Sequence, residues 1–408
     1  MTGVGAGTEA GGAERARVRR GLVWCVGVFV AMRVGLSVLA LASVALLPDP
    51  GTPAAEVAGV PQTVGVPGWP APEVAAGWQN AVTAWERFDA LWFLRIADDG
   101  YRTDDGSAAF FPLYPLLIRG LSGAIGSHPL AAGLLVSNLA LLGALVVLYF
   151  LTASEWGEPA ARRATVFLAI FPTAFFLLAP YSESLFLFLA LLAFWGARRG
   201  RWGVAALAGA AAAATRSVGI VLAPALLVEA IHQHREGRAA LARAIPAAAG
   251  VGLGLLAYLA FWKARSGAWL APLTFQQNWQ RELSMPWETI WDGTREAFRW
   301  IGVYPGGYHL LDWLIVVPVL AGAVWVAVRA RPAYAVFTWA SLLVPLSYIF
   351  PPRPFMSLPR FSVAIFPVLW AAAVWTADRP GLRVATFGAS AAALGVLTVL
   401  FVNWYFVF

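Results

Sequence analysis

The dominant pattern along the chain is a series of long apolar segments separated by short stretches that carry most of the charge. A helix needs about 20 consecutive apolar residues to cross a bilayer, and runs near that length recur along the sequence. We recognise about eleven such segments, at 21–47, 130–152, 164–180, 182–197, 202–214, 217–231, 244–262, 310–328, 332–350, 361–376 and 384–404. The pattern predicts an all-α polytopic membrane protein with about eleven transmembrane helices, in a single transmembrane domain over residues 21–408.

Composition agrees with this fold class, because 60% of the 408 residues are hydrophobic and only 12% are charged. The net charge is +7, but the arginines occur in short clusters between apolar segments, which argues against nucleic-acid binding. The single cysteine, Cys25, excludes a disulfide framework, and the histidine and cysteine spacing offers no metal site. These features argue against a nucleic-acid-binding protein, a disulfide-stabilised protein and a metal site, and they leave an activity within the membrane.

The arginine clusters set the predicted orientation, because cytoplasmic loops are enriched in Lys and Arg. Residues 1–20 are then a disordered cytoplasmic N-terminus, and the loops 48–129 and 263–309 lie on the extracytoplasmic side. Two tight hairpin tips, near residues 181 and 216, share that side. The composition, rich in Arg and Ala with one lysine, favours a bacterial inner membrane.

Residues 202–231 fit either two short helices or one long tilted helix. The single helix would leave one of its flanking arginine clusters outside, so we favour two helices. Helices shorter than a full span are tolerated where they line a cavity within the protein.

The two extracytoplasmic loops are too long to be simple connections. Residues 81–120 have helical spacing, which predicts a helix lying along the membrane interface with its aromatic side chains at headgroup depth. Its apolar stripe consists of Trp85, Phe88, Trp92 and Ile96. The loop 263–309 carries five tryptophans among polar residues, which predicts a second interfacial layer, and residues 48–80 read as an irregular lead-in.

The polar motifs of the chain all fall on the predicted extracytoplasmic side. In chain order they are WERFDALWFLRIADDGY at 85–101, AFFPLYP at 109–115, Phe171-Pro172 leading to Tyr181-Ser182-Glu183-Ser184, Thr215-Arg216-Ser217-Val218-Gly219, and Ser357-Leu358-Pro359-Arg360-Phe361. Together, in this order, they resemble the PIG-V family of mannosyltransferases over nearly the whole chain. The sequence departs from the family pattern at Phe88, where a tryptophan is usual, and at Trp92, where a histidine or another aromatic is common.

The resemblance implies a GT-C type glycosyltransferase, an all-helical membrane enzyme without a diffusible cofactor. Such an enzyme transfers mannose from a polyprenyl-phosphate-mannose donor to an acceptor hydroxyl and inverts the anomeric configuration. The acceptor is a glycolipid, a glycan or a protein, and membrane lipids surround the site. Transfer of another sugar from the same carrier remains an alternative within the enzyme class.

An inverting transfer needs a base that takes the proton of the acceptor hydroxyl. Asp89 is our candidate, because it lies between Phe88 and Trp92 in the aromatic stripe and is the acid that the resemblance marks. The alternative is a carboxylate of an interfacial helix that faces water or pairs with Arg87 or Arg95.

The leaving group is a phosphate that gains negative charge, so a cation should meet it. Arg216 and Arg360 are the candidates, since the planar guanidinium group can donate twice to a phosphate. Arg216 interrupts an apolar stretch, where an arginine usually has a partner or a task. Glu183 is expected either to orient the acceptor or to hold Arg216, with Ser182 as an N-cap.

The remaining candidates for substrate binding have plainer alternative explanations. Asp104 lies beside a turn, where solvated loop charge is the common role. His309 has Asp312 three residues further on, and we consider a proton-handling pair there. For the aromatic candidates packing is the commoner role; they are Trp92, Phe111 and Tyr114.

A transporter or flippase for a lipid-linked sugar is the alternative from another class, because it too needs broken helices and arginines within the membrane. The chain shows no inverted repeat, and its polar motifs fall on one side. Both observations favour the transferase.

Overall fold

The computed structural model describes most of the chain. The described residues are 5–46, 70, 79–126, 128–238, 241–275, 279–299, 301, 307–405 and 407. The predicted irregular lead-in at 48–80 therefore falls almost entirely outside the described residues.

Most of the apolar segments are helical, as predicted, but the segment predicted at 164–180 is helical only to Ala169 and continues in turns and a 3-10 helix. The helices that occupy them are α1 (Gly5–Leu46), α6 (Pro129–Trp156), α7 (Glu158–Ala169), α8 (Glu183–Arg198), α9 (Trp202–Thr215), α10 (Leu222–Arg235), α11 (Leu241–Gly250), α12 (Gly252–Ser266), α15 (Gly307–Arg329), α16 (Pro332–Ser347), α18 (Pro367–Trp375) and α19 (Pro380–Val402). Among the described residues, six helical stretches are long and apolar enough to cross a membrane. The all-α polytopic fold class is confirmed.

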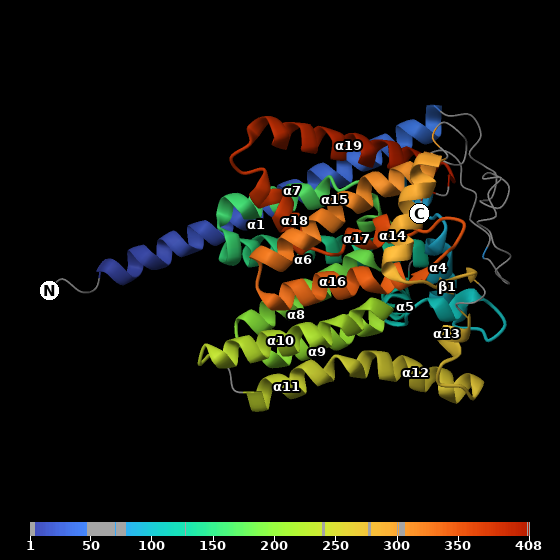
Figure 1. The fold of residues 1–408 in the computed structure, drawn as a ribbon, viewed down its shortest axis with the longest axis horizontal. Coiled ribbons are helices and arrows are strands. Elements are labelled where there is room, and N and C mark those ends of the chain that lie inside the picture. The colour runs from blue at the N-terminus through green and yellow to red at the C-terminus, as the bar shows by residue number, and fades with distance from the viewer. Residues whose placement is uncertain are drawn as a thin grey trace.

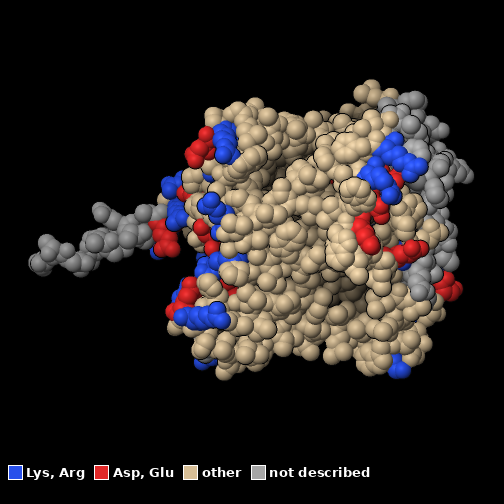
Figure 2. All heavy atoms as spheres, in the orientation of Figure 1, with Lys and Arg blue, Asp and Glu red and all other residues tan. Residues whose placement is uncertain are grey.

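The long helices lie side by side, and the charged groups gather at the two ends of the bundle (Figures 1 and 2). On the face that Figure 2 shows, the surface between the ends is almost free of charged residues. Because a charged side chain is costly inside a bilayer, this band suits the hydrocarbon core. The protein is thus a multi-pass membrane protein, with α4 and α14 at one end and the beginning of α1 at the other (Figure 1).

The first helix is longer than the sequence suggested. It begins at Gly5, so the N-terminal segment predicted to be disordered is helical over its described part. Residues 13–20 alternate alanine, glutamate, arginine and valine, and most of these favour helix. The apolar run after Gly21 then continues the same helix, so a boundary at residue 20 does not exist.

The region 202–231 contains two helices, as predicted. Helix α9 ends at Thr215, Arg216 is extended with φ −151° and ψ 148°, and a 3-10 turn, η4 (Ser217–Val221), leads into α10. A Cβ on Gly219 would lie 2.4 Å from the backbone of Ala212, so only glycine lets η4 fold this closely against α9.

The first long loop folds differently from the single interfacial helix that we predicted. It forms α3 (Asn80–Thr83), α4 (Asp89–Asp99), η2 (Gly106–Ala109) and α5 (Leu113–Ile125). Phe88 interrupts the helical path with a φ of 53°. The residues of the predicted stripe are buried inside the protein, because other protein aromatics cover them. Phe88, for example, packs on Trp404 with ring centroids 5.5 Å apart.

The second loop and the segment before α17 (Leu358–Ser362) are joined by a small sheet. Strand β1 (Glu282–Leu283) pairs antiparallel with β2 (Tyr348–Ile349). The other elements at this end are α13 (Ala271–Phe275), α14 (Pro286–Arg299) and η3 (Ala174–Leu177). On α14, Trp287 and Trp291 are 66% and 70% exposed, which is typical of tryptophans at a membrane interface.

Candidate active site

Four of the predicted site residues meet at one end of the bundle. Arg360 makes an ion pair with Asp89 through Nη1, and its Nε donates to Oε1 of Glu183 at 2.5 Å. The same Oε1 accepts a hydrogen bond from Arg216 Nη1 at 2.6 Å. These residues come from α4, α8, the α9–η4 break and α17, so the fold joins segments that are up to 271 positions apart.

Glu183 is the centre of this cluster. It is the first residue of α8 and is fully buried, and the positive end of the helix dipole stabilises its charge there. The ion pair between Arg216 and Glu183, one of the two roles considered for Glu183, is present. Ser182 does not cap the helix backbone as expected but accepts a hydrogen bond from Arg216 Nη1 at 3.1 Å. Glu183 therefore holds two arginines in fixed positions.

Asp89 is the most accessible acid of the cluster. Its side chain is 20% exposed, whereas that of Glu183 is inaccessible. The partners considered in the alternative, Arg87 and Arg95, bind elsewhere, so a pairing of Asp89 with either of them is wrong. Arg87 donates to the carbonyl of Val402 at 2.9 Å, and Arg95 forms an ion pair with Asp105.

Arg281 joins the cluster, although no sequence motif pointed to it. Its guanidinium donates to Ser357 Oγ at 3.1 Å and to the Tyr348 carbonyl at 3.2 Å. Burial lowers its pKa to about 10, although the nearby carboxylate of Asp89 acts in the opposite sense. The group therefore stays charged at neutral pH. It lies in a tryptophan-rich loop without a local signal of function, and the pairing of β1 with β2 places it here.

The cluster has more positive than negative groups. Three arginines, at 216, 281 and 360, face two carboxylates, those of Asp89 and Glu183. Among the described residues, no carboxylate lies within ion-pair distance of Arg281. A partly buried excess of positive charge is costly unless an anion completes it. The arrangement thus suits an anionic ligand.

Strained backbone gathers at the same place. Among the described residues, the non-glycine residues with positive φ are Phe88, Gln280, Ser357 and Trp404. Phe88 and Gln280 directly precede Asp89 and Arg281, and Ser357 precedes the helix that carries Arg360. Trp404 packs on Phe88. Such strain persists only where surrounding contacts impose it, and it concentrates at functional sites.

Aromatic rings hold the guanidinium groups in place. The Arg360 guanidinium lies over the rings of Tyr181 and Phe176, at 4.6 and 5.1 Å from their centroids. That of Arg216 lies 4.8 Å from the Phe361 centroid. The hydroxyl of Tyr181 donates to the Arg87 carbonyl at 2.8 Å, which fixes the turn before Asp89. These contacts define the positions of the guanidinium groups and of the turn before Asp89.

The aromatic candidates take packing positions. Trp92 is buried and stacks on Phe110 at 5.7 Å between centroids. The hydroxyl of Tyr114 contacts Ser137 Oγ at 2.7 Å and donates to the Gly133 carbonyl at 3.0 Å. Phe111 is only partly buried and packs on the ring of Tyr258 at 4.7 Å between centroids. These contacts shape the loop around the cluster.

The two remaining candidates lie outside the cluster. Asp104 is exposed on its loop, whereas its neighbour Asp105 is buried, accepts from Ser107 N at 2.8 Å and pairs with Arg95 at 2.6 Å. The proposed pair of His309 with Asp312 is wrong, because both oxygens of Asp312 bind Arg353, at 2.6 and 2.8 Å. In the part of the chain that the structure describes, no group of three or more His, Cys, Asp or Glu side chains is arranged to hold a metal.

Comparison with solved structures finds a modest likeness. A structure of ArnT from Cupriavidus metallidurans bound to undecaprenyl phosphate aligns with a TM-score of 0.43 and 17% identity. The alignment covers 79% of this chain and 72% of that chain.

Sequence comparisons identify the family. Two similar curated proteins are the GPI alpha-1,6-mannosyltransferase 2 of Rattus norvegicus, 36% identical over 145 residues, and that of Mus musculus, 37% identical over the same length. Each match covers 33% of this chain and 29% of the relative, so the chain spans less than a third of the curated relatives it matches. The family model Mannosyltransferase (PIG-V) matches residues 36–257, more than half of the chain and including Asp89, Glu183 and Arg216. The chain therefore belongs to the PIG-V mannosyltransferase family.

Proposed function

We propose that this protein is an inverting glycosyltransferase that moves mannose from a polyprenyl-phosphate-mannose donor to an acceptor hydroxyl, with its site at the extracytoplasmic face of a bacterial inner membrane. The observation that carries the proposal is a partly exposed carboxylate, Asp89, within a cluster of three arginines and two acids. Membership of a mannosyltransferase family supports the sugar and the reaction class.

The chemistry follows from the positions of these charges. The Asp89 carboxylate takes the proton of the acceptor hydroxyl, and the oxygen attacks the anomeric carbon of the donor. The bond from that carbon to the phosphate oxygen breaks on the opposite face. Polyprenyl phosphate leaves as a monoester, and its added negative charge is stabilised by guanidinium groups.

The three arginines have different roles in this reaction. Arg360 contacts Asp89 and Glu183 together, so it orients the base relative to the cluster. Arg281 is best suited to the phosphate, because its partners in the described part of the chain are a hydroxyl and a carbonyl rather than a carboxylate. Arg216 is tied to Glu183 and completes the positive wall. Preorganised groups of this kind need little rearrangement when charge develops.

The surroundings suit a substrate that arrives in the membrane. The exposed Trp287 and Trp291 of α14 lie at the same end as the site, and tryptophan side chains favour the headgroup region. A donor whose lipid tail stays in the bilayer would present its phosphate and sugar at this level. The acceptor is a glycolipid, a glycan or a protein that reaches the same face.

The test is a transfer assay with the purified protein in lipid vesicles. Radiolabelled polyprenyl-phosphate-mannose serves as donor and a membrane extract as acceptor. We expect transfer by wild type and a fall of about 10²–10⁴-fold in Asp89→Asn, which keeps the shape of the side chain but removes the base. The matched control is Asp98→Asn, an exposed acid on the same helix, which should transfer at the wild-type rate.

The possible failures have different meanings. Transfer that persists in Asp89→Asn would remove Asp89 as the base while keeping the enzyme class. If wild type transfers a different sugar from the same carrier, only the donor assignment falls. Donor binding without any transfer, together with movement of labelled lipid between leaflets, would replace the transferase by a flippase.

A further inference from the structure

A groove of about 730 Å³ runs along α1 at the opposite end of the molecule from the Asp89 cluster. Its position follows from the helix itself. The C-terminal part of α1 lies at the site end, since Ser43 Oγ accepts from Asn403 Nδ2 at 3.2 Å, close to the Trp404 that packs on Phe88. The groove occupies the N-terminal half of the same helix.

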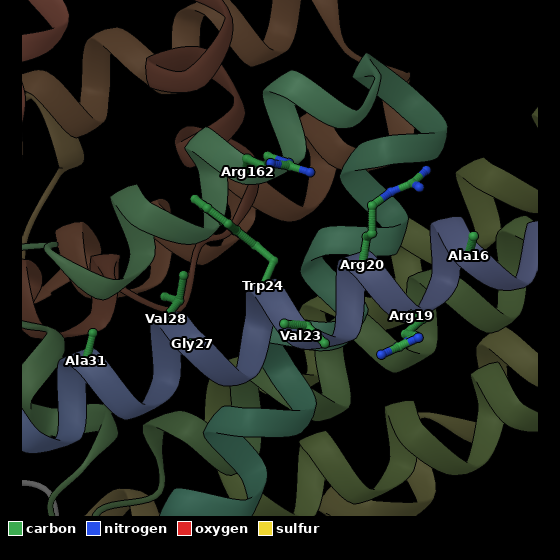
Figure 3. Close-up of a pocket in the computed structure, with 9 residues that line it drawn as sticks. All are labelled: Ala16, Arg19, Arg20, Val23, Trp24, Gly27, Val28, Ala31 and Arg162. Atoms are coloured by element: carbon green, nitrogen blue, oxygen red, sulfur yellow. The ribbon is translucent and has the colours of Figure 1, made fainter.

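The lining residues form one continuous stripe of α1, closed on one side by α7 (Figure 3). They are Ala16, Arg19, Arg20, Val23, Trp24, Gly27, Val28 and Ala31 from α1 with Arg162 from α7. Trp24 forms the joint between the helices, because its Nε1 donates to Thr165 Oγ1 at 2.9 Å. The groove is thus built from two helices with a fixed contact between them.

Charge is confined to one end of the groove. Arg19, Arg20 and Arg162 lie there, and the nearby acid is Glu158, which accepts from Arg162 at 2.9 Å. The guanidinium of Arg162 also lies 5.2 Å from the ring centroid of Trp24. Glu158 faces the guanidinium groups of Arg162 and Arg20, whereas the side chain of Arg19 extends away from these two (Figure 3). Two cations against one carboxylate leave a positive excess that an anion would complete.

The rest of the groove is apolar, and its length can be compared with the thickness of one leaflet. From Arg20 to Ala31 the helix rises roughly 16 Å at 1.5 Å per residue. One leaflet contributes about half of the ~30 Å hydrocarbon core. An apolar chain whose headgroup sits at the arginines would therefore reach about the middle of the membrane at Ala31. A volume of 730 Å³ also lies within the range of about 300–1,000 Å³ typical of ligand sites.

We propose that this groove binds an anionic phospholipid of the leaflet opposite the active site, with its phosphodiester between Arg20 and Arg162 and one acyl chain along Val23, Gly27 and Ala31. The charge at one end and the apolar length of one leaflet together select this occupant. A free phosphate would leave the apolar part empty, and a zwitterionic lipid would place a second positive charge near the arginines. The proposal does not depend on the transferase reaction, since the groove lies at the other end of the bundle.

The experiment measures lipid retained by the purified full-length protein in native mass spectrometry. The protein is equilibrated in micelles with phosphatidylglycerol, with phosphatidylcholine or with undecaprenyl phosphate. We expect phosphatidylglycerol to be retained in preference to phosphatidylcholine. Arg20→Gln should lower phosphatidylglycerol retention about fivefold, because each basic residue near a membrane surface contributes on the order of that factor.

Gly27→Leu tests the apolar part of the groove. Gly27 lines the groove, and a Cβ added there meets no protein atom within 4 Å, so a larger side chain has room at this position. We expect retention to fall about tenfold, because the added side chain fills space that the acyl chain needs. The matched control is Gly35→Leu, on the same helix outside the groove and equally free of contacts. Arg235→Gln, an exposed arginine on α10, controls for general surface charge.

Three outcomes would overturn the proposal. The first is equal retention of phosphatidylglycerol and phosphatidylcholine. The second is equal losses in the groove variants and in their controls, which would reduce the effect to general surface attraction. The third is retention of undecaprenyl phosphate that exceeds that of phosphatidylglycerol and is lost in Gly27→Leu, because the groove would then belong to the carrier lipid. A thermal melt of each variant in phosphatidylcholine verifies that it is folded.

Discussion

Two arginine–carboxylate clusters in this molecule differ in charge balance. Asp312 and Arg353 form a one-to-one pair in which both carboxylate oxygens are bound, and their side chains are 0% and 7% exposed. Arg353 also donates to the Val407 carbonyl at 2.6 Å. The Asp89 cluster instead has three arginines for two acids, and Asp89 retains 20% exposure.

The difference distinguishes a pair that stabilises the fold from a cluster that is suited to binding a ligand. The Asp312–Arg353 pair ties α15 to the loop before α17 and to the end of the chain, and its charges are satisfied within the protein. The Asp89 cluster is incomplete in charge and open on one side, so it can take part in binding and proton transfer. Balanced, closed pairs hold a fold together, whereas an unbalanced, accessible one is suited to a ligand.

The largest effect on stability should come from breaking the balanced pair. Asp312→Asn leaves Arg353 buried without its counter-charge, and we expect a loss of about 3–5 kcal/mol in unfolding free energy. Unfolding in detergent measures the loss, and transfer per folded molecule should stay near wild type. In the double variant Asp312→Leu/Arg353→Met most of the stability should return. A strong loss of turnover in correctly folded Asp312→Asn would show that the pair also serves the reaction.

A large effect on rate, with a smaller one on stability, is expected at the unbalanced cluster. Arg360→Gln removes the group that joins Asp89 to Glu183, and transfer should fall about 10²–10³-fold, as for the loss of one preorganised donor. The measurement is kcat in the vesicle assay, with Arg295→Gln, an exposed arginine on α14, as control. A fall in kcat of less than about threefold would mean that Arg360 does not orient the base.

A smaller effect is expected from the third arginine. Arg281→Gln should raise the donor KM about tenfold with a smaller change in kcat, because one charge-assisted hydrogen bond to the phosphate is lost. Arg281→Lys should recover part of the affinity, since it restores the charge without the planar fork. An unchanged donor KM in Arg281→Gln would assign the phosphate to the other two arginines.

The smallest effects are expected at two neighbouring acids, Asp104 and Asp105, which differ in burial. Asp105 pairs with Arg95 and caps η2, so Asp105→Asn should destabilise the protein by about 1–2 kcal/mol. Asp104→Asn, at the exposed neighbour, should stay within about 0.5 kcal/mol and leave the donor KM unchanged. The measurements are thermal unfolding and transfer kinetics. A raised donor KM in Asp104→Asn would restore Asp104 to the site.

The sequence predicted much of the fold because hydrophobic length is a local property. The apolar segments, the break at Arg216 and the ion pair of Arg216 with Glu183 were all accessible from it. The first loop was less predictable. Helical spacing suggested one interfacial helix, but the positive φ at Phe88 ends that path, and this conformation depends on contacts with distant aromatics such as Trp404.

By itself the sequence determined that this is a helical membrane protein with its polar motifs at one end, because the energy of burying apolar residues in a bilayer depends on each segment alone. Only the tertiary structure decided which charges meet. Arg360 reaches Asp89 across 271 positions and Glu183 across 177, and a two-residue strand carries Arg281 to Ser357. Charge balance is a property of groups brought together in space. No single segment could therefore reveal that one cluster is neutral and buried whereas the other has an excess of positive charge.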